Sequence, residues 1–268
     1  EAALELLNRL ANAEDILPLA LGGRANVRRD MGQFDEALAD INTALELAPD
    51  DKTLLGNKAL TLQHAGQLAA AISTYREALK IYPESEQLHS NLAQALLLDG
   101  QFNEGWQEFE HRLQTPSLLN KRNSLPGVEW QGQAIGSKHL LLWCEQGLGD
   151  TIQFMRYLPL VTARGGDVVF ECPEALAGLG RGLVGAGRVV SDASSMTDID
   201  FHAPLLSLPG IFVTDLSNIP ADVPYLIAEK PNLPETRKLH VGIAWRGSAA
   251  FKRDRIRSLG LGFLGELL

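Results

Sequence analysis

The residues best suited to chemistry form a glycine-rich turn with one acid, Gly147-Leu148-Gly149-Asp150. An apolar run precedes the turn at residues 140–143, and an amphipathic segment follows it from about Thr151. This order is typical of a strand, a tight turn and a helix in an α/β protein. Three roles suit such a turn. It could hold a dinucleotide, Asp150 could act as a general base, or Asp150 could cap the helix.

The dinucleotide interpretation rests on Gly147 and Gly149, which match the first two glycines of G-x-G-x-x-G, and on Glu171 at the end of the next apolar run. Ile152 replaces the third glycine, so the close approach of helix and strand is lost. Asp150 would also place a negative charge where a pyrophosphate should bind. As a helix cap, the same aspartate would contribute about 1 kcal/mol. The sequence therefore disfavours a dinucleotide and leaves the cap and the base open.

A basic cluster at residues 246–257 sets five bases against one acid, Asp254: Arg246, Lys252, Arg253, Arg255 and Arg257. Ser258 is placed to cap a following helix. Such a cluster after a strand is suited to hold a diphosphate, although a solvated basic loop has the same composition. Trp245 could pack under a sugar or a base, or belong to the core.

Other side chains flank the glycine turn. Gln146 and Thr151 are placed to hydrogen-bond a substrate. His202 and Ser207 could line the cleft beside this turn, and for His202 a place at the edge of a core is the alternative. The two cysteines, Cys144 and Cys172, stand near the ends of predicted strands and are expected to be buried free thiols. No zinc-binding spacing occurs, so we expect neither a metal nor a cofactor.

The front half of the chain repeats itself every 34 residues. Gly-Gln pairs recur at 32–33, 66–67 and 100–101, and small residues and prolines recur at the same interval: Ala37 and Ala71, Ala44 and Ala78, Pro49 and Pro83. This pattern resembles the tetratricopeptide repeat, a helix–turn–helix unit in which glycine allows the turn and proline ends the second helix. The interval predicts repeats at 18–51, 52–85 and 86–115, after a partial repeat at 1–17.

The third repeat departs from this pattern, with Gly105-Trp106 and Arg112 at positions where small or aliphatic residues are expected. A repeat that ends a stack is commonly atypical. Repeat arrays bind extended peptides in a concave groove, and Asn57 and Asn91 occupy equivalent positions facing it. Their amides could hold a peptide backbone, as the asparagine ladders of O-linked N-acetylglucosamine transferases do. The alternative is an asparagine without a role, since the first repeat has Gly23 there.

Residues 116–137 are rich in Pro, Gly, Ser and Asn and are predicted to be a linker, with Trp130 pinning it to an apolar surface. A Rossmann-like lobe is expected at 138–235, with strands at 139–144, 168–172 and 188–190. Strands that alternate with helices predict a parallel sheet. The segment 240–247 would then be a strand that opens a second lobe at 236–268. We interpret the chain as a fragment cut at both ends.

The segment "EQGLGDTIQFMRYLP" (145–159) resembles the first strand, turn and helix of the ADP-heptose lipopolysaccharide heptosyltransferases. The chain as a whole is similar to bacterial proteins that join tetratricopeptide repeats to a glycosyltransferase-like domain, through segments 105–112, 130–132, 204–212, 219–226 and 241–258. The resemblance implies a two-lobed GT-B fold, in which the acceptor lobe comes first and the second lobe binds the nucleotide-sugar donor. It also implies that Asp150 is the base and that the basic cluster binds the departing diphosphate.

We therefore expect the full-length protein to be an inverting glycosyltransferase that modifies a protein or glycan acceptor recruited by the repeats, and the fragment alone to be inactive. The alternative is a repeat scaffold with a degenerate, non-catalytic glycosyltransferase domain. Residues 1–115 contain 18 acids against 9 bases, which argues against a nucleic-acid partner. No run of about 18 apolar residues occurs, so no membrane span is expected. A cytoplasmic location is expected.

Overall fold

The computed structural model describes residues 2–10, 16–183 and 187–227, together with residues 243, 244, 247, 258–260, 262 and 265. The chain divides into two compact units, Glu1–Ala228 and Glu229–Leu268. The predicted strand at 240–247 and most of the predicted second lobe lie outside the described residues. None of the described helices is long and apolar enough to cross a bilayer.

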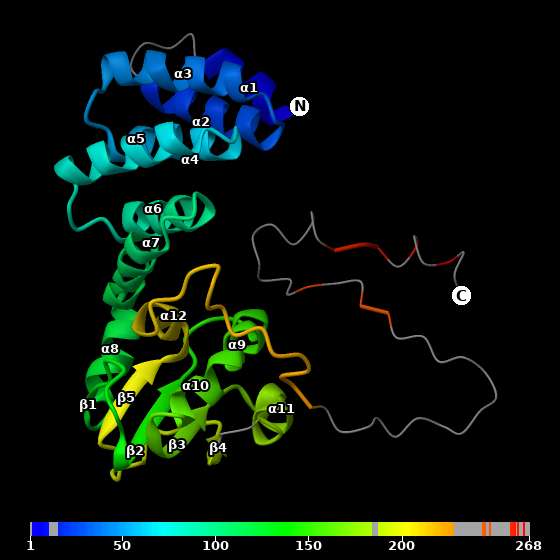
Figure 1. Ribbon diagram of the computed structural model, residues 1–268. Coiled ribbons are helices and arrows are strands. Elements are labelled where there is room, and N and C mark those ends of the chain that lie inside the picture. Colours follow the sequence, from blue (N-terminus) through cyan, green and yellow to red (C-terminus); the bar gives the residue numbers. More distant parts are fainter. Residues whose placement is uncertain are drawn as a thin grey trace. The chain divides into compact units, whose positions relative to one another are not determined.

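The front half of the first unit consists of helix–turn–helix pairs (Figure 1). Each pair has a three-residue connection that contains a glycine with positive φ, namely Gly32, Gly66 and Gly100 (φ 77° to 81°). Only glycine adopts this conformation without a steric cost, which explains why it recurs every 34 residues. The helices are α1 (Ala2–Leu10), α2 (Leu17–Asp30), α3 (Phe34–Leu47), α4 (Lys52–His64), α5 (Leu68–Ile81), α6 (Glu86–Leu98) and α7 (Phe102–Phe109).

Small residues at the same place in each second helix let the pairs pack closely. Ala37 and Ala71 are fully buried, and Gly105 is buried at the equivalent position of α7. A Cβ atom on Gly105 would lie 2.8 Å from the side chain of Leu97 on α6. Glycine therefore replaces alanine in the third repeat because its two helices lie closer together there.

The second half is an α/β structure around a five-stranded parallel sheet with the order β1-β5-β2-β3-β4. The strands predicted at 139–144, 168–172 and 188–190 exist, the first two with shifted bounds, and β5 and β1 are additional. Residues 140–143 of the central strand β2 are all buried and so cover both of its faces, which explains their uninterrupted apolar run. The strands are β1 (Val128–Glu129), β2 (Gly136–Trp143), β3 (Gly165–Glu171), β4 (Arg188–Val190) and β5 (Phe201–Pro204).

Two cores cover the two faces of this sheet. On one face, Leu140 and Leu142 pack with Leu158 and other residues of the segments between the strands. On the other face, Leu141 and Trp143 pack with residues that include Leu113, from the end of the repeat array. The array and the sheet thus share a core. The short helices of this part are α8 (Pro116–Ser124), α9 (Leu148–Phe154), α10 (Leu158–Thr162), α11 (Ala177–Arg181) and α12 (Leu208–Ile211).

The segment predicted as a linker, 116–137, contains regular structure. It forms α8 and the edge strand β1, which pairs with β5. The residues that indicated a linker have local structural roles. Pro116 lies in the first turn of α8, and Gly127 has a φ of +81° directly before β1. Trp130 is buried, as its expected contact with an apolar surface requires.

Candidate functional site

The glycine turn connects β2 to α9, and it places Asp150 inside the helix. Helix α9 begins at Leu148 with Gly147 as its N-cap residue, so Asp150 is the third helical residue. The expectation that Asp150 is the N-cap is therefore wrong. Its Oδ2 instead accepts a hydrogen bond from the backbone N–H of Gly147 at 3.2 Å. A carboxylate at this position stabilises the first turn by satisfying a free donor and by complementing the helix dipole.

The residues around Asp150 divide into exposed and structural ones. Asp150, Gln146, Gly147 and Gly149 are exposed. Thr151 is fully buried, and its hydroxyl donates a hydrogen bond to the carbonyl of Gly147 at 3.1 Å. The Oδ1 atom of Asp150 has no hydrogen-bond partner among the described residues. The turn therefore presents one free carboxylate oxygen to solvent at the carboxyl end of the central strand.

The crevice beside β2 is where an open parallel sheet usually binds its ligand. The chain passes from β2 to β3 and β4 on one side and later returns to β5 on the other, which makes β2–β5 the topological switch point. Ligands bind outside the carboxyl ends of strands at such a point. In this protein the residues that follow the two strands are Glu145 after β2 and Leu206 and Ser207 after β5.

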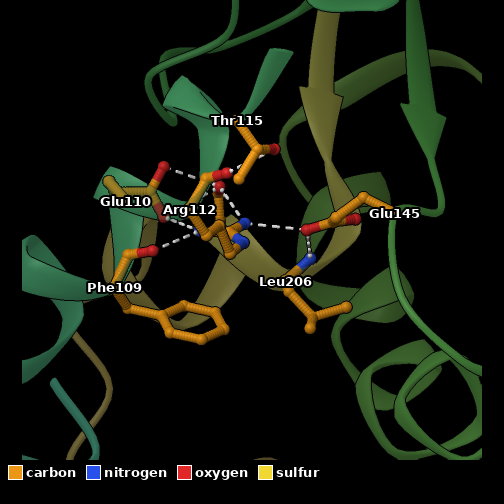
Figure 2. A network of polar contacts seen from close by, with 7 residues as sticks. Phe109, Glu110, Arg112, Thr115, Glu145 and Leu206 are labelled. Carbon is orange, nitrogen blue, oxygen red and sulfur yellow. Dashed lines mark hydrogen bonds and ion pairs between the residues drawn. The ribbon is translucent and has the colours of Figure 1, made fainter. Parts of the chain in front are cut away.

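A side chain from the repeat array reaches the residues that follow these two strands (Figure 2). Nη2 of Arg112, in the short helix η2 (Glu110–Gln114), lies 2.7 Å from Oε1 of Glu145 and 2.9 Å from Oγ of Ser207. Its Nη1 lies 2.7 Å from Oε1 of Glu110. The hydroxyl of Ser207 donates in turn to the Glu110 carboxylate at 2.8 Å. The backbone N–H of Leu206 donates to Oε1 of Glu145 at 3.1 Å. We call these residues the junction network.

The junction network is buried. The side chains of Arg112 and Glu145 are 6% and 0% exposed. Burial raises the pKa of Glu145, whereas the charge and hydrogen bond of Arg112 and the N–H of Leu206 lower it. A buried carboxylate needs a paired cation and hydrogen bonds to remain ionised. Arg112 therefore joins the last repeat to the sheet through a buried ion pair, in which each part supplies one of the two charges.

A second polar contact joins the same parts. The indole N–H of Trp106 on α7 donates to the carbonyl of Thr214 at 2.9 Å. The hydroxyl of Tyr157 lies 3.2 Å from Oγ1 of Thr214. Trp106 and Arg112 are both residues at which the third repeat departs from the pattern. Their unusual types are explained by contacts with the α/β part.

His202 lies on β5 and lines a cavity of about 430 Å³ between α7, η2, β1 and α12. Its side chain is 4% exposed, and its Nδ1 has no partner among the described residues. Burial lowers the pKa of His202. The lining residues include Trp106, Glu110 and Glu129 and none of residues 146–151. The structure therefore places His202 in a separate cavity from the Asp150 turn.

The remaining predicted site residues are untested by these contacts. Asn57 and Asn91 are half-buried on α4 and α6, and Oδ1 of Asn91 accepts a hydrogen bond from Gln87 at 2.9 Å. In the second unit, Oγ of Ser258 accepts a hydrogen bond from the N–H of Gly247 at 2.9 Å. The other predicted residues of that unit lie outside the described residues: Trp245, Lys252, Arg253, Arg255 and Arg257.

Of the junction network, only Ser207 was singled out from the sequence, although the sequence contained a signal for Arg112. Arg112 occupies the place that Ala44 and Ala78 hold in the preceding repeats, and both alanines are fully buried. A charged residue at a buried position requires a counter-charge. Glu145, an acid directly after a buried strand, was the available partner. Their separation of 33 residues gave no local indication that they meet.

Comparisons with known proteins identify the helical array. Residues 15–84 match the family model of the tetratricopeptide repeat. Protein FlbA of Caulobacter vibrioides is 32% identical over 152 residues, which are 55% of this chain and 20% of FlbA. The matched region thus spans about a fifth of that relative's length. The array is a repeat scaffold of the kind that binds protein partners.

Solved structures similar to the chain contain the same type of repeat. A tetratricopeptide repeat protein from Parabacteroides merdae is 21% identical, with 42% of this chain and 44% of that chain covered and a TM-score of 0.37. The first tetratricopeptide repeat domain of human RPAP3 is 19% identical, with 40% and 87% covered and a TM-score of 0.36. These likenesses say nothing of partners.

Proposed function

We propose that the full-length protein transfers a sugar from a nucleotide-sugar donor to a protein or glycan acceptor that its repeats recruit. Asp150 would take the proton from the acceptor hydroxyl, and the basic segment that contains Lys252, Arg253, Arg255 and Arg257 would hold the diphosphate. The observation that carries the proposal is the position of Asp150. It is exposed at the carboxyl end of the central strand, with Oδ2 held by Gly147 and Oδ1 without a partner among the described residues.

This geometry suits a general base because the two oxygens can have different tasks. The hydrogen bond from Gly147 fixes the orientation of the carboxylate, and the second oxygen can accept a proton. The resemblance to the heptosyltransferases supports the same role. No metal is required by this chemistry, since the basic segment would supply the positive charge that the leaving diphosphate needs. We propose a cytoplasmic location, where nucleotide sugars are available.

The second candidate is a repeat scaffold without catalysis. It is favoured by the junction network, which fills the usual ligand crevice of the sheet with Arg112. The family match, which covers the repeats, agrees with this function equally well. The two candidates differ in one property: only the enzyme needs to bind a nucleotide sugar.

Calorimetric titration of the full-length protein with a panel of nucleoside diphosphates and nucleotide sugars separates the candidates. Saturable binding of one nucleotide, weakened by substitution of Arg255 and Arg257, is expected for the enzyme. No binding across the panel by the folded protein would favour the scaffold.

The role of Asp150 is tested with the sugar nucleotide that binds. Asp150→Asn keeps an oxygen that can accept the Gly147 hydrogen bond but removes the base, and it should lower kcat by about 10²-fold or more with unchanged nucleotide affinity. Asp192→Asn is the matched control, because Asp192 is also exposed and also accepts a backbone hydrogen bond, from Ser194 at 2.8 Å. Equal turnover in both variants would show that Asp150 only stabilises the turn.

A further inference from the structure

The third repeat contains a cluster of two histidines and one glutamate that the proposed function does not use. His89 lies on α6, Glu108 on α7 and His111 on η2. One nitrogen or oxygen from each of the three side chains lies within 4.8 Å of the others. Glu108 and His111 are only three residues apart, but His89 lies 19 residues before Glu108, so the sequence did not indicate that the three meet.

The two ring nitrogens of His89 have different partners. Nε2 lies 2.7 Å from the backbone carbonyl oxygen of Pro83, which can only accept, so Nε2 carries a hydrogen. Nδ1 lies 2.5 Å from Oε2 of Glu108. If the ring were neutral, a lone pair on Nδ1 would face a carboxylate oxygen at this distance, which is repulsive. A proton must therefore lie between these two atoms at this distance, and a metal ion could take its place only if the atoms move apart.

The surroundings of this position also suit a metal ion in place of the proton. A histidine that binds a metal nearly always donates its other N–H to a carbonyl or carboxylate, as His89 does to Pro83. A third donor is at hand, because the His111 ring stacks on the His89 ring with centroids 3.5 Å apart. The side chains of His89 and Glu108 are 11% and 21% exposed, so an ion and a completing water can enter from solvent.

We propose that His89, Glu108 and His111 bind a divalent transition metal, with Zn²⁺ the best match to two imidazoles and one carboxylate. Typical Zn–N and Zn–O distances of about 2.0–2.2 Å would separate Nδ1 of His89 and Oε2 of Glu108 to about 3 Å or slightly more. The His89 and His111 rings are parallel within 1°, so an ion in the plane of one ring lies outside the plane of the other. Binding therefore turns the His111 ring out of the stack.

The consequence of such a site is structural. The metal would tie α6, α7 and η2 together directly before Arg112, the residue that enters the sheet crevice. Because a ligand that binds only the folded state stabilises it, Zn²⁺ should raise the melting temperature of the protein. It should also fix the end of the array that carries the junction network.

The test is calorimetric titration of chelator-treated protein with ZnCl₂, with two variants that keep the local contacts. Glu108→Gln retains an amide that can hydrogen-bond Nδ1 of His89, and His111→Phe retains a ring for the stack. We expect one Zn²⁺ per chain, with affinity at least about 10-fold weaker in either variant. His139→Phe is the control, because His139 also lies near two carboxylates, those of Asp167 and Asp200, at 3.9 and 4.0 Å.

Three results would overturn the proposal. One is the absence of saturable binding with one equivalent of Zn²⁺ in the unaltered protein. Another is unchanged affinity in both cluster variants, which would leave a proton between His89 and Glu108. The third is an equal loss of affinity in His139→Phe, which would show binding to scattered surface histidines. Circular dichroism of each variant establishes that the helices are intact. Because the two variants remove different ligands, one folded variant is enough to test the proposal if the other fails to fold.

Discussion

The junction network makes a quantitative prediction about what couples the repeat array to the sheet. Arg112→Met removes the cation that Glu145 needs, and it keeps an unbranched side chain of similar reach. Oε1 of Glu145 would then retain only the N–H of Leu206, while the side chain remains fully buried. Because the carboxylate can no longer be paired, the folded state of the variant must contain either a buried charge or a protonated acid.

The expected loss follows from these alternatives. Removing one partner of a buried ion pair typically costs about 3–5 kcal/mol in the free energy of unfolding. Burial already raises the pKa of Glu145, so without Arg112 this carboxyl can take up a proton and avoid part of the penalty. We therefore expect a loss near the lower end of the range, about 3 kcal/mol at pH 7.

The same reasoning fixes the pH dependence of this loss. A carboxyl whose pKa is higher in the folded than in the unfolded state stabilises the fold when protonated. This contribution is complete below the unfolded value near 4.5 and is lost as the pH rises through the folded value. The deficit of Arg112→Met relative to the unaltered protein should therefore shrink as the pH falls from 7 towards 4.5.

Urea denaturation, followed by circular dichroism and by tryptophan fluorescence, measures the loss through linear extrapolation. Arg76→Met is the matched control, because Arg76 forms a bidentate pair with Glu104 that is 46% and 40% exposed. Its loss should be at most about 1 kcal/mol. The double variant Arg112→Met/Glu145→Leu should recover most of the stability, since an apolar pair can replace a buried ion pair.

Two outcomes would refute this reasoning. If Arg112→Met costs no more than Arg76→Met, the pair does not behave as a buried one. If the double variant is as unstable as the sum of both single variants, the loss comes from packing around the Arg112 side chain, which lies 4.3 Å from the centre of the Phe109 ring, and the charges are not its cause.

Three further predictions concern the α/β part. Burial lowers the pKa of His202 in the folded state. The stability that the neutral His202 ring contributes is therefore present above the unfolded pKa near 6.5 and is lost as the pH falls through the lowered folded pKa. His202→Gln should therefore reduce the loss of stability between pH 7 and 5. Burial raises the pKa of Cys144 to about 12 and that of Cys172 to about 11, so iodoacetamide at pH 8 should alkylate the native thiols at least about 10²-fold more slowly than the urea-unfolded ones. Gly127→Ala should lower the free energy of unfolding, measured by urea denaturation, by at least about 3 kcal/mol, because its Cβ would lie 2.5 Å from the carbonyl oxygen of Asp200. Gly136→Ala, with open space around it, should lower it by only about 1–2 kcal/mol. Equal losses in the two variants would mean that only the backbone conformation matters.

The repeats could be predicted from the sequence because their determinants are local. A glycine with positive φ recurs at every turn, and buried alanines recur at one face of each second helix. The strands β2 and β3 were predictable for a similar reason, since both of their faces are buried and their apolar runs are continuous. Strand β5 was missed because its four residues include a histidine and a proline, and they are buried only through pairing with distant strands.

The candidate site was predicted less well, for physical reasons that differ between its residues. Asp150 was singled out by its position after a strand and a glycine turn, and its role as a base stays a prediction. Its place in the helix was wrong because Leu148 and Gly149 already belong to α9. The partner of Arg112 depended on a contact across the chain. The sequence contained the buried charge, and only the structure could supply the acid that neutralises it.

The junction network also restricts where a ligand of the sheet can bind. Arg112, Glu145 and Ser207 fill the switch-point crevice, so a ligand there would have to break a buried ion pair. Nε of Arg112 and Oε2 of Glu145 are buried without a hydrogen-bond partner among the described residues. Asp150 lies on the exposed side of the same strand end, where no such cost applies. An acceptor hydroxyl would therefore reach Asp150 from solvent, beside the crevice and not through it. The junction network, which favours the scaffold, thus leaves the carboxylate of Asp150 accessible for the proposed catalysis. Nucleotide binding remains the property that distinguishes the enzyme from the scaffold.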